Sequence, residues 1–265
     1  MSPEANVPVV TVNSSVQYQV IEGFGGAFTE SSTWIYNQLG DAGKQQLLDL
    51  YFGKESLGYS MARLPMGACD FSLGTNSYGE FDGDVNLTRF TIERDVRLGR
   101  IGFIKDAIAA RGTAFPNSTE TSIKLLGSPW SSPWWMKSNR AMVCSVWMYI
   151  LGCKLSTDPT IQASYGQYFV KYVDAMKELG LNIWAVTPQN EPETENLLTY
   201  ESMVFTPAEE RDWIKDYLGP ALKAAHPDVL IFQYDHNKGH LPTWVDTVLG
   251  DPDAAQYIAG TAYHW

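Results

Sequence analysis

The sequence is poor in basic residues and contains no long apolar run. Its 265 residues include 19 Lys and Arg against 30 Asp and Glu, which gives a net charge of −11. This balance excludes nucleic acid and anionic membranes as main partners, because both require clusters of basic side chains. The longest apolar segment, residues 141–153, is too short for a membrane-spanning helix, which needs about 20 residues. The N-terminus has neither a charged region nor an apolar stretch that would predict a signal peptide.

Cysteine is scarce, and no phosphate-binding glycine pattern is present. Cys69, Cys144 and Cys153 show no metal-ligand spacing with His. Residues 23–26, GFGG, lack the spacing of a dinucleotide-binding loop and predict only a tight turn. We therefore expect neither a metal nor a cofactor. For Cys144 and Cys153, a disulfide and two free thiols fit the sequence equally well.

Three Asn-x-Ser/Thr triplets are present, at Asn13, Asn86 and Asn117. Such triplets are acceptors for N-glycosylation in secreted proteins. They are compatible with a glycosylated protein of the secretory route.

The sequence does contain apolar strand-like runs that alternate with amphipathic helical stretches. The predicted strands are residues 18–28, 59–67, 123–130, 182–186, 229–235 and 259–265. The predicted helices are residues 31–52, 93–112, 158–180, 206–225 and 241–258. Short apolar strands alternating with helices indicate a parallel sheet covered by helices. The fold class is therefore α/β, an incomplete (β/α)₈ TIM barrel with about six of eight units.

Two helices carry clear local signals. Residues 158–180 have one apolar stripe, made of Tyr165, Phe169, Tyr172, Met176 and Leu179. Thr206, Pro207 and Glu209 predict a capping box at the start of the following helix. Residues 1–20 alternate like an exposed β segment, so we place them outside the barrel, which takes up residues 21–265.

The C-terminal ends of barrel strands carry the active site in this type of fold. The predicted strand ends hold carboxylates, an amide, an Arg and several aromatic residues. They are Glu30, Arg63, Asp70, residues 128–137, Asn190, Glu191, Asp235, Asn237, Tyr263, His264 and Trp265. Such a set suits a neutral ligand with many hydroxyl groups.

The hexapeptide TPQNEP, residues 187–192, is the most informative of these strand ends. Pro188 and Pro192 remove backbone donors and fix φ, so they stiffen the turn that carries Asn190 and Glu191. Cleavage of a glycosidic bond requires two carboxylates, one of which is a proton donor with a raised pKa. Glu191 is the acid/base candidate, and the Asn190 amide can bind the sugar 2-hydroxyl.

Other charged residues have simpler interpretations. For Asp235, a helix cap is the alternative to a place in the strand-end set. We expect Glu193 and Glu195 to be solvated loop charges. For His264, a core histidine and a substrate-facing histidine fit the sequence about equally well.

Five ordered motifs now point to a known family. They are VIEGFGGAFTESS (20–32), ARLPMGACDFSL (62–73), GSPWSSPWWMKSN (127–139), VTPQNEP (186–192) and YHW (263–265). In this order they resemble glycoside hydrolase family 30, in particular its glucosylceramidase branch. The resemblance implies a catalytic (β/α)₈ barrel, residues 21–265, with a side β-domain to which residues 1–20 would belong, and cleavage of β-glycosides with retention of configuration.

The resemblance also implies roles for individual residues. Glu191 matches the acid/base, with Asn190 beside it. Asp70 and Trp130 match positions that hold the glucose hydroxyls, Arg63 an Arg that supports the nucleophile, and His264 a His that lines the site. Tyr200 and Asn237 fall near aglycone-side positions, although the loop at Tyr200 differs in length, and Trp265 is a further candidate beside His264.

The sequence also departs from the family pattern. The nucleophilic Glu of the family lies at the end of the seventh strand, and no residue of this sequence matches it. Strands seven and eight are not matched either, and residues 140–152 carry bulky apolar side chains where a loop is expected. The expectation is therefore a C-terminally incomplete chain that lacks the nucleophile.

Several functions follow from the resemblance. The first is a retaining β-glycosidase acting on glucosylceramide or related β-glucosides, extracellular or lysosomal, with peripheral contact to a lipid membrane. The alternatives are an inactive truncated protein that binds sugar or glycolipid, and a β-1,6-glucanase or β-xylosidase of the same family.

The absence of a matched nucleophile predicts that residues 1–265 alone are inactive or nearly so, because no covalent glycosyl intermediate can form. A fluorogenic β-glucoside assay on the purified 265-residue polypeptide checks this. Hydrolysis that depends on Glu191 would contradict it.

Overall fold

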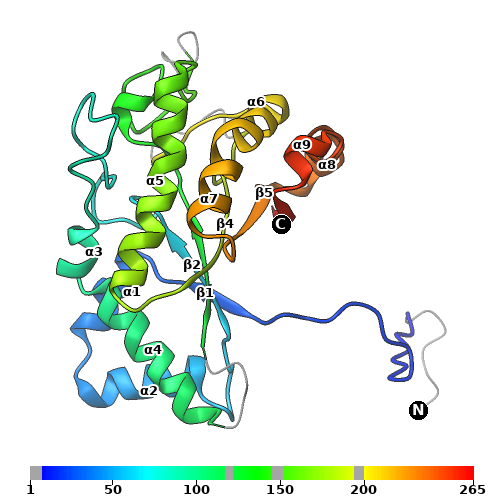
Figure 1. The fold of residues 1–265 in the computed structure, drawn as a ribbon. Helices are drawn as coiled ribbons and strands as arrows, with labels where there is room; N and C mark the ends of the chain where they lie inside the picture. Colours follow the sequence, from blue (N-terminus) through cyan, green and yellow to red (C-terminus); the bar gives the residue numbers. More distant parts are fainter. Residues whose placement is uncertain (1–7, 117–121, 145–151, 194–199) are drawn as a thin grey trace.

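The computed structural model describes residues 8–116, 122–144, 152–193 and 200–265. Six parallel strands lie side by side in sequence order and form one curled sheet (Figure 1). They are β1 (Gly25–Ala27), β2 (Met61–Pro65), β3 (Lys124–Ser128), β4 (Ile183–Val186), β5 (Leu230–Asn237) and β6 (Ile258–His264). The sheet is a half-barrel, which confirms the predicted partial TIM barrel.

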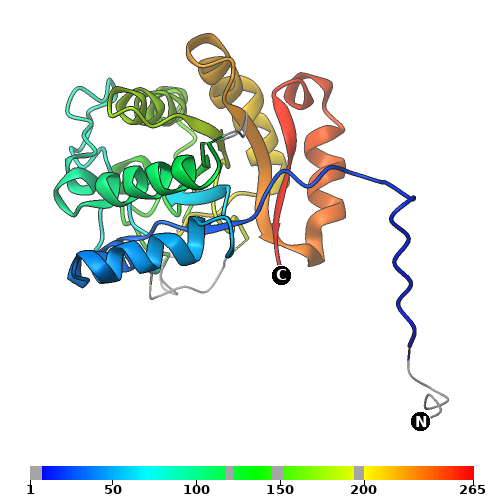
Figure 2. The same ribbon diagram turned by 90° about the horizontal axis from the view of Figure 1, so that it is seen from below.

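Helices surround the sheet on its outer side, as the view from below shows (Figure 2). They are α1 (Glu30–Gln38), α2 (Asp41–Phe52), α3 (Glu93–Arg97), α4 (Arg100–Ala114), α5 (Pro159–Glu178), α6 (Pro207–Trp213), α7 (Gly219–Ala225), α8 (Leu241–Leu249) and α9 (Pro252–Ala255). Short 3₁₀ turns cover Trp134–Met136 and Lys238–His240. Within the described parts of the chain, every helix falls short of the length and apolarity that a membrane crossing needs.

Three predicted helices are broken. Residues 31–52 form α1 and α2, because Leu39 is extended (ψ 140°) between them. Residues 93–112 form α3 and α4, because Gly99 adopts a left-handed conformation (φ 85°) that ends α3. Residues 241–258 likewise form α8 and α9, and β6 already begins at Ile258.

Two other helix predictions are confirmed. The side chains of Tyr165, Phe169, Tyr172 and Met176 in α5 are buried in the core. Leu179, the last residue of the predicted stripe, caps the helix and packs half-buried against the same core. The Thr206 side chain accepts from the N–H of Glu209, whose carboxylate accepts from the N–H of Thr206. Helix α6 then continues through a π-helical turn, Ile214–Leu218, into α7.

The glycine cluster at residues 23–26 does not form the predicted tight turn. Gly25 and Gly26 belong to β1 and pair with Met61 and Ala62 of β2. A Cβ atom at Gly25 would lie 1.7 Å from the Met61 carbonyl oxygen. The glycine is therefore required for the close approach of the first two strands.

The N-terminal segment lies apart from the barrel. Residues 8–24 form no strand, and the segment runs away from the sheet (Figure 1). Its large apolar side chains are exposed, such as Val12 at 89% and Tyr18 at 86%. Membership of a side β-domain stays a prediction.

Cys144 and Cys153 form a disulfide with Cα atoms 5.4 Å apart, whereas Cys69 is a buried free thiol. The disulfide lies against residues 202–204: the Cys144 N–H donates to Ser202 Oγ at 3.2 Å, and the Cys153 carbonyl accepts from the Val204 N–H at 2.8 Å. The buried Lys137 ammonium donates to the Ser202 carbonyl at 2.6 Å. Most of the unusual segment 140–152, namely residues 145–151, and Asn117 lie outside the described residues.

The disulfide predicts a definite contribution to stability. Replacing both cysteines with Ser should lower the free energy of unfolding by about 2–3 kcal/mol, because a nine-residue separation closes a short loop in the unfolded chain. Urea denaturation of the Cys144→Ser/Cys153→Ser variant measures this. The wild type in reductant should match the variant, and an equal stability of oxidised and reduced wild type would contradict the prediction.

Candidate active site

Polar side chains from four strands meet at the C-terminal end of the half-barrel. Arg63 of β2 donates through Nη2 to Asn190 Oδ1 at 2.7 Å and to Asp235 Oδ2 at 2.6 Å. Asn190 and Glu191 follow β4, Asp235 lies in β5, and His264 ends β6. The structure therefore brings together the sequence-predicted Arg63, Asn190, Glu191 and His264.

The turn at residues 187–192 is fixed from both neighbouring strands. The N–H of Asn190 donates to the Pro129 carbonyl at 2.8 Å, and the N–H of Glu191 donates to the Asp235 carbonyl at 3.0 Å. The Gln189 side chain donates to the Trp130 carbonyl at 2.7 Å. Glu191 itself has a left-handed backbone (φ 48°), a conformation that costs free energy in a residue with a Cβ atom.

His264 bridges the two carboxylates of the site. Its Nδ1 lies 3.1 Å from Glu191 Oε1, and its Nε2 lies 3.0 Å from Asp235 Oδ1. Burial alone would lower the pKa of His264, but the hydrogen bonds to Asp235 and Glu191 outweigh it and raise the pKa to about 9. His264 is therefore a cation at neutral pH, and both ring nitrogens donate. This places His264 in the site rather than in the core.

The pKa of Glu191 is shifted opposite to the sequence prediction. The hydrogen bond from His264 lowers the pKa, burial opposes this, and the charges of His264 and His236 lower it further. A raised pKa was expected for a proton donor. The prediction is wrong for the site as the described residues form it, because a cationic imidazole lies against the carboxylate.

Asp235 is the central residue of the network, a role that the sequence analysis did not assign to it. Its carboxylate is buried and accepts from Arg63, from Thr187 Oγ1 at 2.6 Å and from His264. Burial would raise the pKa of Asp235, but the charge of Arg63 and the bonds from His264 and Thr187 lower it to about 2. The interpretation of Asp235 as a helix cap is wrong, and its position at a predicted strand end was the signal for the site.

Three further predicted residues lie around this network. The Tyr200 hydroxyl donates to Glu191 Oε2 at 3.2 Å. The Arg63 guanidinium stacks over the largely buried Trp130 ring, 4.5 Å from its centroid. Burial and the charge of Glu191 raise the pKa of Asp70, whose side chain is exposed beside the site.

Within the described parts of the chain, the other predicted residues lie beside this network or apart from it and form no side-chain hydrogen bond to it. Asn237 is exposed and contributes its carbonyl to the Tyr234 hydroxyl. Trp265 is 84% exposed and packs edge-on near His264. Glu30 begins α1 instead of ending a strand, and its buried carboxylate pairs with Arg94 at 2.6 Å.

The prediction that Glu193 is a solvated charge is also wrong. Its carboxylate lies 3.0 Å from His240 Nδ1 and accepts from the Tyr234 hydroxyl at 3.4 Å. It therefore ties the turn after β4 to the end of β5. Glu195 lies outside the described residues.

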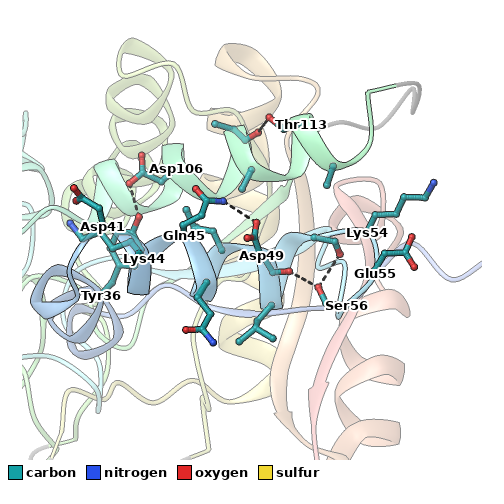
Figure 3. Close-up of a pocket in the computed structure, with 18 residues that line it drawn as sticks. Tyr36, Asp41, Lys44, Gln45, Asp49, Lys54, Glu55, Ser56, Asp106 and Thr113 are labelled. Atoms are coloured by element: carbon teal, nitrogen blue, oxygen red, sulfur yellow. Dashed lines mark hydrogen bonds between the residues drawn. The ribbon is translucent and has the colours of Figure 1, made fainter.

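A groove lies between α2 and α4, away from the residues of the site (Figure 3). This groove of about 1220 Å³ includes no residue of the site, and several of its polar groups are paired with each other, such as the Tyr36 hydroxyl with Asp106 at 2.8 Å. It therefore adds nothing to the site. Among the described residues, no group of His, Cys, Asp and Glu side chains is arranged to hold a metal ion.

A family comparison identifies this arrangement. Residues 21–265 match the glycosyl hydrolase family 30 TIM-barrel domain. The chain belongs to glycosyl hydrolase family 30. The matched range includes the Asn190–Glu191 pair at the end of β4.

Relatives within the family cover nearly the whole chain. It is 35% identical over 97% of its length to putative glucosylceramidase 3 of Caenorhabditis elegans and 34% identical over 97% to lysosomal acid glucosylceramidase of Mus musculus. The chain covers 47% and 48% of these relatives, so it spans about half of their length.

Solved structures agree with this. SrfJ from Salmonella typhimurium superposes with a TM-score of 0.81 at 31% identity, over 93% of this chain and 51% of that one. An endo-β-1,6-glucanase superposes with a TM-score of 0.79 at 30% identity, over 95% of this chain and 53% of that one.

The His264 bridge predicts a specific pH dependence of stability. The folded-state pKa of about 9 lies above the ordinary 6.5, so the contribution of His264 is fully present below pH 6.5 and is lost as the pH rises through 9. The difference in unfolding free energy between wild type and His264→Gln should shrink by up to about 3 kcal/mol between pH 6 and pH 9.5.

Urea unfolding of both proteins at matched pH values measures this difference. Subtracting the variant removes the pH dependence of groups that His264 does not influence, such as the buried Lys137, whose pKa burial lowers to about 7. A difference that stays constant or grows with pH would contradict a protonated His264.

Proposed function

We propose that the protein is a retaining β-glycosidase that hydrolyses glucosylceramide or a related β-glucoside, with Glu191 as the acid/base. The observation that carries the proposal is the fixed Glu191 carboxylate, which His264 and Tyr200 hold from its two oxygens. The Glu191 backbone is also fixed, because its N–H donates to the Asp235 carbonyl. A carboxylate held in this way is preorganised for proton transfer to a substrate oxygen.

Glu191 would give a proton to the leaving oxygen and later take one from the attacking water. The adjacent Asn190 accepts from Arg63 through Oδ1, so its NH₂ group is the part that can donate to the sugar 2-hydroxyl. The 2-hydroxyl contact strengthens as the transition state forms. Arg63 thus occupies the oxygen of the Asn190 amide and leaves its NH₂ group for the sugar.

Glu191 must carry a proton before the first step, although His264 lowers its pKa. A second carboxylate close to Glu191 would raise this pKa by charge repulsion. We assign this carboxylate, the nucleophile, to a seventh strand, as the family resemblance implies. An acidic compartment would also favour protonation, and the mouse relative is named a lysosomal enzyme. We propose a lysosomal or secreted location for this protein too.

Asp70 and Trp130 are proposed to bind the glucose unit. Asp70 is exposed beside Glu191 and can accept from two sugar hydroxyls. Trp130 presents a ring that Arg63 already holds in place. Tyr200, Asn237 and Trp265 are proposed to lie toward the aglycone, where a ceramide substrate would bring the site near a lipid surface.

Replacing Glu191 with Gln tests the proposed acid/base role. In the form of the protein that carries all eight strands, kcat on an alkyl β-glucoside should fall by about 100-fold or more, because the leaving oxygen is no longer protonated. A dinitrophenyl β-glucoside needs no such proton, so its first step should fall much less. The alkyl glucoside is followed by steady-state product release, and the dinitrophenyl glucoside by the burst of dinitrophenol in the first turnover, because the second step still needs Glu191 as a base.

Glu178→Gln is the matched control, because Glu178 is exposed at the end of α5 and remote from the site in sequence and element. It should leave both rates unchanged. Equal losses on both substrates in Glu191→Gln would contradict the acid/base assignment.

An endo-β-1,6-glucanase is the second candidate function. It is favoured by the solved glucanase at a TM-score of 0.79 and by a 34% identical relative named endo-1,6-β-D-glucanase. Release of glucose from glucosylceramide in detergent, with no cleavage of β-1,6-glucan, would support the first candidate. The reverse result would replace it with the glucanase.

A further inference from the structure

A buried carboxyl group lies behind the site and takes no part in the proposed chemistry. Glu210 of α6 is 0% exposed. Its Oε1 accepts from the backbone N–H of Tyr234 at 2.9 Å, and its Oε2 has no partner among the described residues. Burial raises the pKa of Glu210 to about 8; the Tyr234 N–H opposes this and the charge of Asp235 adds to it. Glu210 is therefore mostly a neutral acid at pH 7.

The residues that Glu210 contacts form an irregular part of β5. Tyr234 and Asp235 both have left-handed backbones, with φ of 77° and 65°. The pairing of β5 with β6 shifts register between Tyr234 and His236. In a regular strand successive side chains face opposite sides, yet Gln233, Tyr234 and Asp235 are all buried. The bulge thus turns the Asp235 side chain into the site.

Two consecutive left-handed residues with side chains are unfavourable and persist only where surrounding contacts hold them. The bond from the Tyr234 N–H to Glu210 is such a contact, and it lies one residue before Asp235. An unpaired buried N–H in its place would add the free-energy cost of a lost hydrogen bond. The bulge therefore depends on an acceptor at position 210.

The bulge in turn supports the acid/base residue twice. The Asp235 carbonyl accepts from the N–H of Glu191 at 3.0 Å, and the Asp235 carboxylate holds His264 at 3.0 Å. His264 reaches Glu191 Oε1 from its other nitrogen. A change in the Asp235 backbone would thus move both the main chain and the side-chain partner of Glu191.

We propose that Glu210 is a positioning residue of the site, which holds the β5 bulge through the Tyr234 N–H and so presents Asp235 to His264 and Glu191. Its effect reaches Glu191 only through Asp235. An effect of Glu210 on catalysis rests on the proposed function, whereas its effect on the position of Asp235 does not.

The pKa of His264 is the readout, because Glu191, Asp235 and Arg63 are the charged groups that set it. It is measured by NMR titration of the histidine ring signals, which are assigned with His264→Gln among the four His of the sequence. Glu210→Leu removes the acceptor, and the pKa of His264 should fall from about 9 by roughly one pH unit or more toward its ordinary value. Glu210→Gln keeps an oxygen acceptor of the same length, and the pKa should stay within about half a unit of wild type.

Glu209→Ala is the matched control. Glu209 is the neighbouring glutamate of the same helix, where it closes the capping box and pairs with Lys154 at 2.7 Å. Its loss should lower thermal stability without changing the pKa of His264. If Glu210→Leu behaves like this control, with lower stability and an unchanged His264 pKa, the proposal is overturned.

Two further variants keep the test decisive. Should Glu210→Leu not fold, Glu210→Asp replaces it, because the shorter side chain draws the acceptor away from Tyr234; an unchanged His264 pKa would again overturn the proposal. Asp235→Asn should lower the His264 pKa by itself. Adding Glu210→Leu should lower it by less than it does in the wild type, because only the path through the backbone carbonyl of residue 235 to Glu191 remains. An undiminished fall in the double variant would show a route other than Asp235. These titrations need no substrate, so they stand apart from any failure to hydrolyse β-glucosides.

Discussion

The buried carboxylate of Asp235 is the interaction on which the site depends. It joins β2 through Arg63, the end of β4 through Thr187, and β6 through His264. A buried ion is costly unless charged and hydrogen-bonding partners surround it, so each of these strands must end in register for the others to be stable. The sheet register therefore also fixes the geometry of the site. Glu191 is positioned by Asp235 in two ways, through its own N–H and through His264.

This network also explains the direction of the Glu191 pKa. A cationic His264 between two carboxylates keeps both ionised, which suits Glu191 as a base. Its role as an acid requires another negative charge near it, and a carboxylate nucleophile provides that charge in retaining enzymes. In this view His264 keeps Glu191 ionised, and the second carboxylate raises the pKa of Glu191 so that it can donate a proton.

Much of this was predictable from the sequence, and the rest has physical causes. Parallel strands with polar residues at their ends located Arg63, Asn190, Glu191 and His264, because strand ends follow from periodicity. The strand end also placed Asp235 among the candidates, but its central position was not predictable, because the left-handed bulge at residues 234–235 overrides strand alternation and is held by Glu210, which lies on a helix. The break between α3 and α4 also depends on one backbone angle, at Gly99. The disulfide was left open because both states of Cys144 and Cys153 fit the spacing.

The protonation state of His264 at pH 7.5 tests this account most directly. Nitrogen-15 NMR of the imidazole separates a doubly protonated ring from either neutral tautomer. Two protonated nitrogens, each hydrogen-bonded to a carboxylate, are the predicted result. A neutral ring at this pH would contradict the bridge between Glu191 and Asp235, and with it the reason for the low pKa of Glu191.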